Sequence, residues 1–380
     1  MIAFHLISVA LHYAVPFLVI LTVLVFVHEM GHFLVARKNG VRVETFSIGF
    51  GPEVFGWTDK HLTRWKICWL PLGGYVKMFG DANAASMPGE ALESMTPEER
   101  AVAFQFKTVG QRAAVVAAGP IANFLFAILV LAGLFMAVGQ PYTPPVVGAV
   151  VADSAAQRAG FAPGDRIVGI NGTKIERFQQ VQQIVQLGLN EPLAIDVERA
   201  GKLLHLKAVP SIVEQHDNFG HTFRIGQLGL EAKGLEYVRM EPAAALWHAV
   251  RQSAVLTGST LKAVGQMIVG TRTTEELGGP LRIAEMSGEV AQGGVVSSVW
   301  FLAVLSINLG LINFFPIPML DGGHLMFYAV EAVRRRPLAP RIQDYGFRIG
   351  LTLVLLLMIF ATWNDLVHLK VIQYVANLIS

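Results

Sequence analysis

Two histidines and a glutamate stand close to the start of the chain at the spacing of a metal site. The segment His28-Glu29-Met30-Gly31-His32 matches the pattern H-E-x-x-H. Residues i and i+4 of a helix project from one face, so both imidazoles can bind the same Zn²⁺ ion. The glutamate between them can then reach the attacking water as a general base. The alternative is a pair of structural histidines beside a chance glutamate.

A catalytic zinc site needs a third protein ligand and one open position. The chain has a single cysteine, Cys68, so a cysteine-rich zinc site is excluded and the third ligand is sought among His, Asp and Glu. Asp321 is the candidate, because two prolines and two glycines in the stretch 313–323 interrupt any regular helix around it. Broken backbone at membrane depth is tolerated only against protein or water, as in a catalytic cavity. A helix end with a surface aspartate is the alternative.

The composition places these residues in a membrane protein. The chain is 53% hydrophobic and only 15% charged, whereas soluble chains carry about 25% charged residues. The net charge of +2 gives no reason to expect nucleic-acid binding. Glu29 is the one formally charged residue before Arg37, and a charge inside a span is a functional candidate by default. Four apolar stretches are predicted to span the bilayer: 1–36, 113–139, 291–328 and 347–370.

Basic residues predict the orientation of these spans. Arg37, Lys38 and Arg42 follow the first span, and five arginines crowd the loop between the third and fourth spans. The loops 37–112 and 328–348 are therefore expected to face the cytoplasm, and the region 140–290 the outside. His32 and Asp321 then both lie toward the cytoplasmic ends of spans that run in the same direction. The three candidate ligands can meet at one depth.

The cytoplasmic loop 37–112 holds a predicted β-hairpin at 64–79. Residues 64–69 and 75–78 have strand-like composition, and Pro71-Leu72-Gly73-Gly74 separates them as a turn. Its tryptophan, isoleucine and leucine residues are too apolar for a solvated hairpin. We therefore expect the hairpin to be membrane-associated.

The region 144–212 is predicted to be a separate β-rich domain. Strands are expected at 166–170, 193–199 and 203–209, with a helix at 178–187. The runs Ala159–Ile167 and Ile170–Gly172 resemble a PDZ domain. A folded spacer without a peptide ligand is the alternative to a peptide-binding domain.

The region 236–290 is predicted to contain an amphipathic helix on the outer surface. Arg251 and Lys262 lie eleven residues apart, close to three helical turns, so both charges share one face. A fifth span is the competing interpretation.

Three motifs together resemble the site-2 protease family of intramembrane zinc metalloproteases. They are H-E-x-x-H in the first span, Gly119-Pro120-Ile121-Ala122-Asn123 in the second, and Leu320-Asp321-Gly322 in the third. The similarity covers nearly the whole chain and is greatest to the bacterial regulator-of-sigma-E branch. Its best-known members carry two tandem PDZ domains, whereas this chain has room for one.

The resemblance implies a role for each matching residue. Asn123 would position substrate or stabilise the oxyanion, or else be a polar kink residue satisfied by a neighbouring helix. Asn313 would contact the unwound substrate backbone, or else cap a helix. An edge strand of the hairpin would pair with the extended substrate. The implied zinc ligands are His28, His32 and Asp321, the general base is Glu29, and the substrate-binding residues of the hairpin are Gly73, Gly74 and Tyr75.

The expected fold is a polytopic α-helical membrane protein with about four transmembrane helices, an inserted PDZ-like domain and a membrane-associated β-hairpin. By resemblance it would cleave single-span proteins of the bacterial inner membrane, such as a pre-trimmed anti-sigma factor or remnant signal peptides. The PDZ-like domain would lie in the periplasm and the active site toward the cytoplasm. A catalytically idle membrane scaffold is the alternative function. The oligomeric state does not follow from the sequence.

Overall fold

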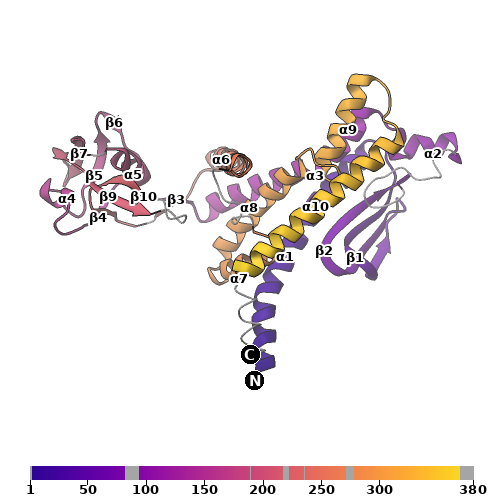
Figure 1. Ribbon diagram of the computed structural model, residues 1–380, viewed down its shortest axis with the longest axis horizontal. Helices are drawn as coiled ribbons and strands as arrows, with labels where there is room; N and C mark the ends of the chain where they lie inside the picture. Colours follow the sequence, from indigo (N-terminus) through magenta and orange to yellow (C-terminus); the bar gives the residue numbers. More distant parts are fainter. Residues whose placement is uncertain are drawn as a thin grey trace. The chain divides into compact units, whose positions relative to one another are not determined.

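The chain forms two compact units (Figure 1). The computed structural model describes residues 2–81, 94–188, 190–216, 222–234, 236–270 and 278–368. Within the predicted regions, residues 1, 82–93, 189, 271–277 and 369–370 lie outside these ranges. One unit combines Met1–Leu134 with Pro242–Ser380, and the other is Phe135–Glu241.

The first unit is mainly helical. Four of its described helices contain segments long and apolar enough to cross a membrane: Leu11–Lys38, Val109–Ala137, Val295–Asn313 and Arg341–Leu366. This confirms the prediction of about four transmembrane helices. The longer helices of the unit are α1 (Ile2–Lys38), α3 (Val109–Ala137), α6 (Pro242–Val269), α7 (Pro280–Gln292), α8 (Val295–Asn313), α9 (Asp321–Arg334) and α10 (Pro340–His368), and two short ones are α2 (Pro97–Val102) and η2 (Phe104–Phe106).

The helix bounds refine two of the predicted stretches. The third stretch, 291–328, is interrupted between α8 and α9, where the prolines of the 313–323 stretch remove backbone donors. The predicted region 236–290 contains α6 and most of α7, and α6 is not among the four helices that are apolar enough to span.

Two long strands, β1 (Val43–Thr58) and β2 (Arg64–Met78), form the sheet of the first unit. The predicted hairpin was wrong in its pairing and in the position of its turn. Residues 45–48 of β1 pair on one side with 74–77 and on the other with 64–67, so the two expected partners are separated by β1. The chain reverses at 59–63 instead, where Asp59 accepts hydrogen bonds from the backbone of His61 and Thr63 at 2.8 and 3.0 Å.

One end of this sheet is buried and the other is exposed. Phe46 is 1% exposed and stacks on Trp65 with ring centres 4.5 Å apart, next to Phe33 of α1. The far end presents apolar side chains to the surroundings, with Phe55 61% and Trp69 72% exposed. The buried end fixes the sheet to the helices, and the exposed end gives it a surface suited to lipid.

The second unit is β-rich and corresponds to the single insert predicted from the sequence. Its bounds are wider than the predicted 144–212, because β11 pairs with β4 and β12 pairs with β3. Its elements are β3 (Gln140–Tyr142), β4 (Val147–Val150), α4 (Ala155–Arg158), β5 (Arg166–Ile170), β6 (Thr173–Lys174), α5 (Phe178–Leu187), β7 (Leu193–Arg199), β8 (Lys202–Ala208), β9 (Ser211–His216), β10 (Thr222–Gln227), β11 (Leu230–Ala232) and β12 (Glu236–Val238).

The core of the second unit lies between a four-stranded sheet, in the order β6-β5-β7-β8, and α5. Ile167, Ile195 and Val197 point into it and are fully buried, together with Val181 of the helix. The strands predicted at 166–170 and 193–199 and the helix at 178–187 are confirmed. Alternating burial along β7 explains why its pattern was readable from the sequence.

Candidate active site

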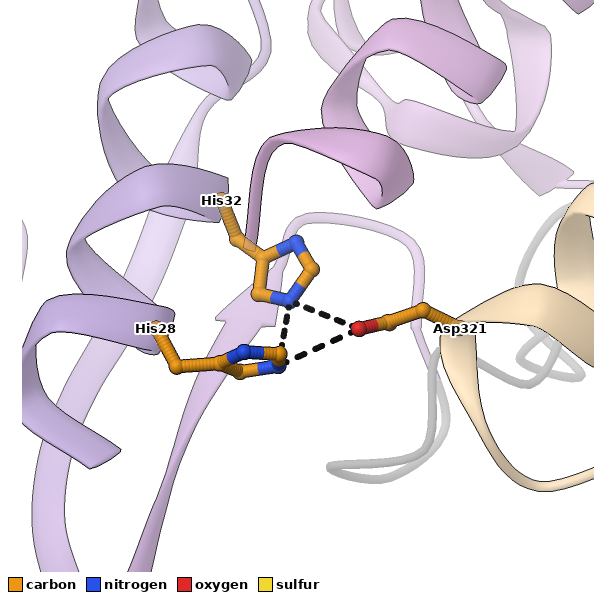
Figure 2. A group of neighbouring side chains, drawn as sticks. All are labelled: His28, His32 and Asp321. Atoms are coloured by element: carbon orange, nitrogen blue, oxygen red, sulfur yellow. Dashed lines mark hydrogen bonds and ion pairs between the residues drawn. The ribbon is translucent and has the colours of Figure 1, made fainter. Parts of the chain in front are cut away.

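Two histidines of α1 and one aspartate of α9 meet inside the first unit. His28 and His32 lie one helical turn apart on the same face of α1, and Asp321 is the first residue of α9 (Figure 2). Oδ2 of Asp321 lies 3.1 Å from Nε2 of His28 and 3.5 Å from Nε2 of His32. The two Nε2 atoms are 3.2 Å apart. The structure thus brings the three predicted ligands together across almost 300 residues of sequence.

The break between α8 and α9 aims Asp321 at the histidines. Met319 adopts a φ of 91°, a region that non-glycine residues rarely occupy. Gly322 and Gly323 allow α9 to start tightly against this break, because a Cβ at either position would overlap backbone carbonyls of 314–317. Gly350 of α10 packs against Pro318 in the same way. Local strain and tight packing therefore fix the direction of the Asp321 side chain.

The α1 helix lies very close to α3 at the histidines. A Cβ on Gly31 would overlap the backbone of Ala118, and a Cβ on Gly119 would overlap the imidazole of His32. Small residues at such contacts let two helices approach closely within a membrane. Nδ1 of His32 lies 2.9 Å from the carbonyl oxygen of Val115, which makes that nitrogen the donor and leaves Nε2 free to bind a metal.

Glu29 shares a cavity of about 200 Å³ with the three candidate ligands. The edge of the β-sheet forms its opposite wall, where a Cβ on Gly74 would lie 3.4 Å from Cγ of Glu29. The carboxylate is thus between the histidines and the strand. The cavity has five further lining residues that no motif in the sequence marks: Val76, Met78, Val116, Met319 and His324.

The four remaining predicted residues of the helix end and the hairpin lie near this cavity. Gly74, Tyr75 and Asn313 line it. Gly73 comes directly before Gly74 in β2 and faces the ring of Phe50. Asn313 also donates from Nδ2 to the carbonyl of Leu309 at 3.0 Å, so it terminates α8 and borders the cavity at once.

Asn123 occupies a different place from the other polar residues of the site. Its side chain is 0% exposed, and its Nδ2 lies 3.2 Å from Nδ1 of His28, the ring nitrogen that points away from Asp321. It is not among the residues that line the cavity. Asn123, on α3, therefore lies on the side of His28 that faces away from Asp321.

The three ligand atoms fit a metal ion. They all lie within 4.8 Å of one another. Oδ2 of Asp321 is buried and makes no hydrogen bond within the described part of the chain, because its contacts with the imidazoles have ion-pair distances without hydrogen-bond geometry. An unsatisfied buried carboxylate oxygen beside two imidazoles is stabilised by a cation. Two nitrogens and one oxygen are a typical donor set of catalytic zinc.

Known proteins agree with this assignment over nearly the whole chain. Residues 16–357 match Peptidase family M50. A protein of Rhizobium meliloti (strain 1021) named as a zinc metalloprotease is 48% identical over 362 residues, which cover 94% of this chain and 97% of that relative. The metalloprotease MmpA of Caulobacter vibrioides is 39% identical over 394 residues, covering 96% and 98%.

Among solved structures, a PDZ domain is similar to part of the chain. It is the PDZ domain of the SdrC-like protein of Listeria monocytogenes, at 18% identity and a TM-score of 0.18, and the match covers 25% of this chain and 93% of that one. The family match begins within α1 and ends within α10, and so includes every residue of the candidate site. The chain therefore belongs to Peptidase family M50, the site-2 protease family.

Proposed function

We propose that this zinc metalloprotease hydrolyses peptide bonds within the transmembrane segments of single-span membrane proteins. One observation carries the proposal: His28, His32 and Asp321 converge beside Glu29 in a unit that has four helices long enough to span a membrane. A protease site inside such a unit faces substrates that are themselves held in the lipid bilayer.

The roles of the side chains follow from their positions. His28, His32 and Asp321 would hold the ion, which when bound activates water and polarises the scissile carbonyl. Glu29 lies in the same cavity and takes a proton from the attacking water. It then delivers that proton to the leaving amine. Asn313, at the cavity wall, is placed to donate to the substrate backbone from an amide that also terminates α8.

The edge of the β-sheet is suited to holding the substrate in an extended conformation. Residues 74–78 pair with β1 on one side only within the described residues, and Gly74 and Tyr75 border the cavity. A helical segment hides its peptide bonds, so it must unwind before it is cut. Pairing with this edge would replace the lost backbone hydrogen bonds.

An apolar chamber of about 530 Å³ lies close to the catalytic cavity. Leu72 and Ile312 line the chamber, and Gly74 and Asn313, from the same elements, line the cavity. An apolar chamber next to polar catalytic groups suits a substrate whose flanking residues come from a membrane span. By resemblance to the family, the proposed substrate class includes pre-trimmed anti-sigma factors and remnant signal peptides.

The proposed location is the bacterial inner membrane, with the β-rich unit in the periplasm and the catalytic site toward the cytoplasm. The positions of the basic residues beside the spans support this orientation. The exposed aromatic end of the β1–β2 sheet supports its association with the bilayer surface, where tryptophan is favoured.

The test is co-expression of candidate single-span proteins with the wild type and with three variants. Glu29→Gln is expected to retain zinc and lose cleavage, because the ligands survive and the general base does not. His28→Ala and Asp321→Ala are expected to lose both. Full cleavage by the Glu29→Gln protein would overturn the mechanism. A wild type that holds no zinc and cuts none of the candidates would favour a membrane scaffold instead.

A further inference from the structure

Asn123 is buried at the point where three helices meet. Its side chain is 0% exposed, and its backbone oxygen accepts a hydrogen bond of 2.8 Å from Oγ of Ser306 on α8. Gly310 brings α8 close to α3 here, since a Cβ on it would lie 2.9 Å from the carbonyl of Pro120. Helices α3 and α8 are thus tightly packed at this point, and Nδ2 of the Asn123 amide lies 3.2 Å from Nδ1 of His28.

The chemistry of a metal-binding imidazole determines what Asn123 must do. A neutral histidine that binds a metal through Nε2 carries its hydrogen on Nδ1, and this N–H needs an acceptor. The oxygen and nitrogen of an asparagine amide have nearly the same shape, so the amide can be turned over without changing its packing. In that orientation Oδ1 takes the place of Nδ2 next to Nδ1 of His28. The amide oxygen as placed has no hydrogen-bond partner among the described groups, so no competing contact fixes the opposite orientation.

The second histidine also turns its Nδ1 toward a polar group of α3. Nδ1 of His32 faces the carbonyl oxygen of Val115, also on α3, at 2.9 Å. The pairs His32–Val115 and His28–Asn123 follow opposite directions along the two helices, as expected where α1 and α3 are antiparallel neighbours. One helix thus faces each imidazole with a polar group, a backbone carbonyl for His32 and a side-chain amide for His28.

We propose that Asn123 is a positioning residue of the zinc site, whose Oδ1 accepts a hydrogen bond from Nδ1–H of His28 and so directs Nε2 toward the ion. The proposal rests on the proposed function, because it assumes that His28 binds zinc. It differs from a role in binding substrate or stabilising an oxyanion, for which the side chain would have to reach the cavity. Asn123 reaches the chemistry through His28.

Two variants separate the acceptor from the volume of the side chain. Asn123→Asp keeps an acceptor of the same size, and Asn123→Leu keeps the size without an acceptor. Zinc affinity is measured on the full-length protein in detergent by competition with a chelator, and Co²⁺ replaces Zn²⁺ to report ligand geometry by visible absorption. Asn123→Leu is expected to weaken zinc about 10- to 100-fold, as measured for other partners of metal-binding histidines. Asn123→Asp is expected to retain wild-type affinity and the wild-type cobalt spectrum.

A matched control removes the neighbouring hydrogen bond without touching the acceptor. Ser306→Ala deletes the bond to the backbone of Asn123 and is expected to leave zinc affinity unchanged. If Asn123→Leu does not accumulate in the membrane, Asn123→Asp and Ser306→Ala still test the proposal. Equal loss of zinc in Asn123→Asp and Asn123→Leu would overturn it, as would wild-type zinc affinity in Asn123→Leu together with lost cleavage. Wild-type affinity in a His28→Ala protein would overturn the proposed ligand set itself.

Discussion

Arg112 and Glu331 form a buried ion pair that joins α3 to the helix that begins at Asp321. Nη2 of Arg112 lies 2.7 Å from Oε2 of Glu331, and the two side chains are 13% and 4% exposed. The other carboxylate oxygen accepts a hydrogen bond from the backbone of Leu338 at 3.1 Å. The guanidinium also lies 4.7 Å from the ring centre of Tyr328 on α9. Because α9 carries Asp321 at its first position, this contact helps fix the carboxylate relative to α3.

Glu331→Gln is expected to destabilise the first unit and to weaken zinc binding. The change leaves the Arg112 guanidinium buried without a counter-charge, which typically costs about 3–5 kcal/mol. Thermal unfolding and zinc content of the purified protein measure the two effects. Glu44→Gln is the control, since Glu44 pairs with Lys77 at 2.9 Å with both side chains about one-third exposed, at 31% and 35%. Equal melting temperatures for the two variants would show that the buried pair has no special role.

Gly119→Ala is expected to disturb the metal site through His32. The added methyl group would overlap the imidazole, because a Cβ on Gly119 would lie 2.2 Å from Nε2 of His32. The displaced ring should lower zinc content and cleavage together.

Gly133→Ala is the matched control on the same helix, because nothing lies within 4 Å of a Cβ at that position. Alanine is favoured over glycine in a helix by about 1 kcal/mol, so this variant should be as stable as the wild type or more so. A Gly119→Ala protein with full zinc content and normal cleavage would contradict the close contact between α3 and His32.

The local motifs of the site could be predicted from the sequence. His28 and His32 were readable because one helical turn separates them, and Asp321 because prolines and glycines interrupt the span around it. The place of Asn123 could not be predicted, since the face of α3 that meets His28 depends on the packing of glycines such as Gly31 and Gly119. Spacing along one helix does not reveal which residue of another helix lies behind a ligand.

The sheet was predicted less well, because its pairing is not local. Residues 64–67 and 74–77 have strand composition and were assigned to each other, yet both pair with residues 45–48. The sequence does not reveal β1 as one strand, because Gly49, Gly51 and Pro52 interrupt its alternating pattern. The same glycines permit the bends that allow β1 to pair twice, with positive φ at Gly49 and Gly51. The glycines that interrupt the sequence pattern of β1 are thus also the residues that let the strand bend.

Cysteine labelling tests the proposed orientation. Lys174→Cys lies in the β-rich unit and Arg336→Cys in the loop after α9, and both positions are exposed. The native Cys68 is 4% exposed and should react little. An impermeant thiol reagent should label Lys174→Cys in spheroplasts, and Arg336→Cys only after the membrane is opened. The reverse result would place the catalytic site toward the outside.

A buried carboxylate gives the β-rich unit a dependence on pH. Asp165 is 0% exposed, and burial alone would raise the pKa of its carboxyl group. Hydrogen bonds from Arg199 and from the backbone N–H of Ala162, at 2.8 and 2.9 Å to Oδ2, together hold that pKa below its ordinary value. Because the pKa is lowered in the folded state, the stabilisation is complete above the unfolded value of about 3.9. It is lost as the pH falls through the folded value.

Hydrogen exchange of the amides of β5 in the full-length protein measures this effect, after correction for the intrinsic exchange rate. Protection in the wild type is expected to hold from neutral pH down to about pH 4 and to decrease below it. Arg199→Met leaves the carboxylate buried with fewer partners, so protection should be lower at neutral pH and should change less on acidification.

Lys174→Met is the control on the same unit, because Lys174 and Glu176 pair at 3.3 Å with side chains 82% and 68% exposed. Such surface pairs contribute about 0–1 kcal/mol, so that variant should match the wild type at every pH. Identical profiles for Arg199→Met and Lys174→Met would mean that the Asp165–Arg199 pair does not stabilise the unit.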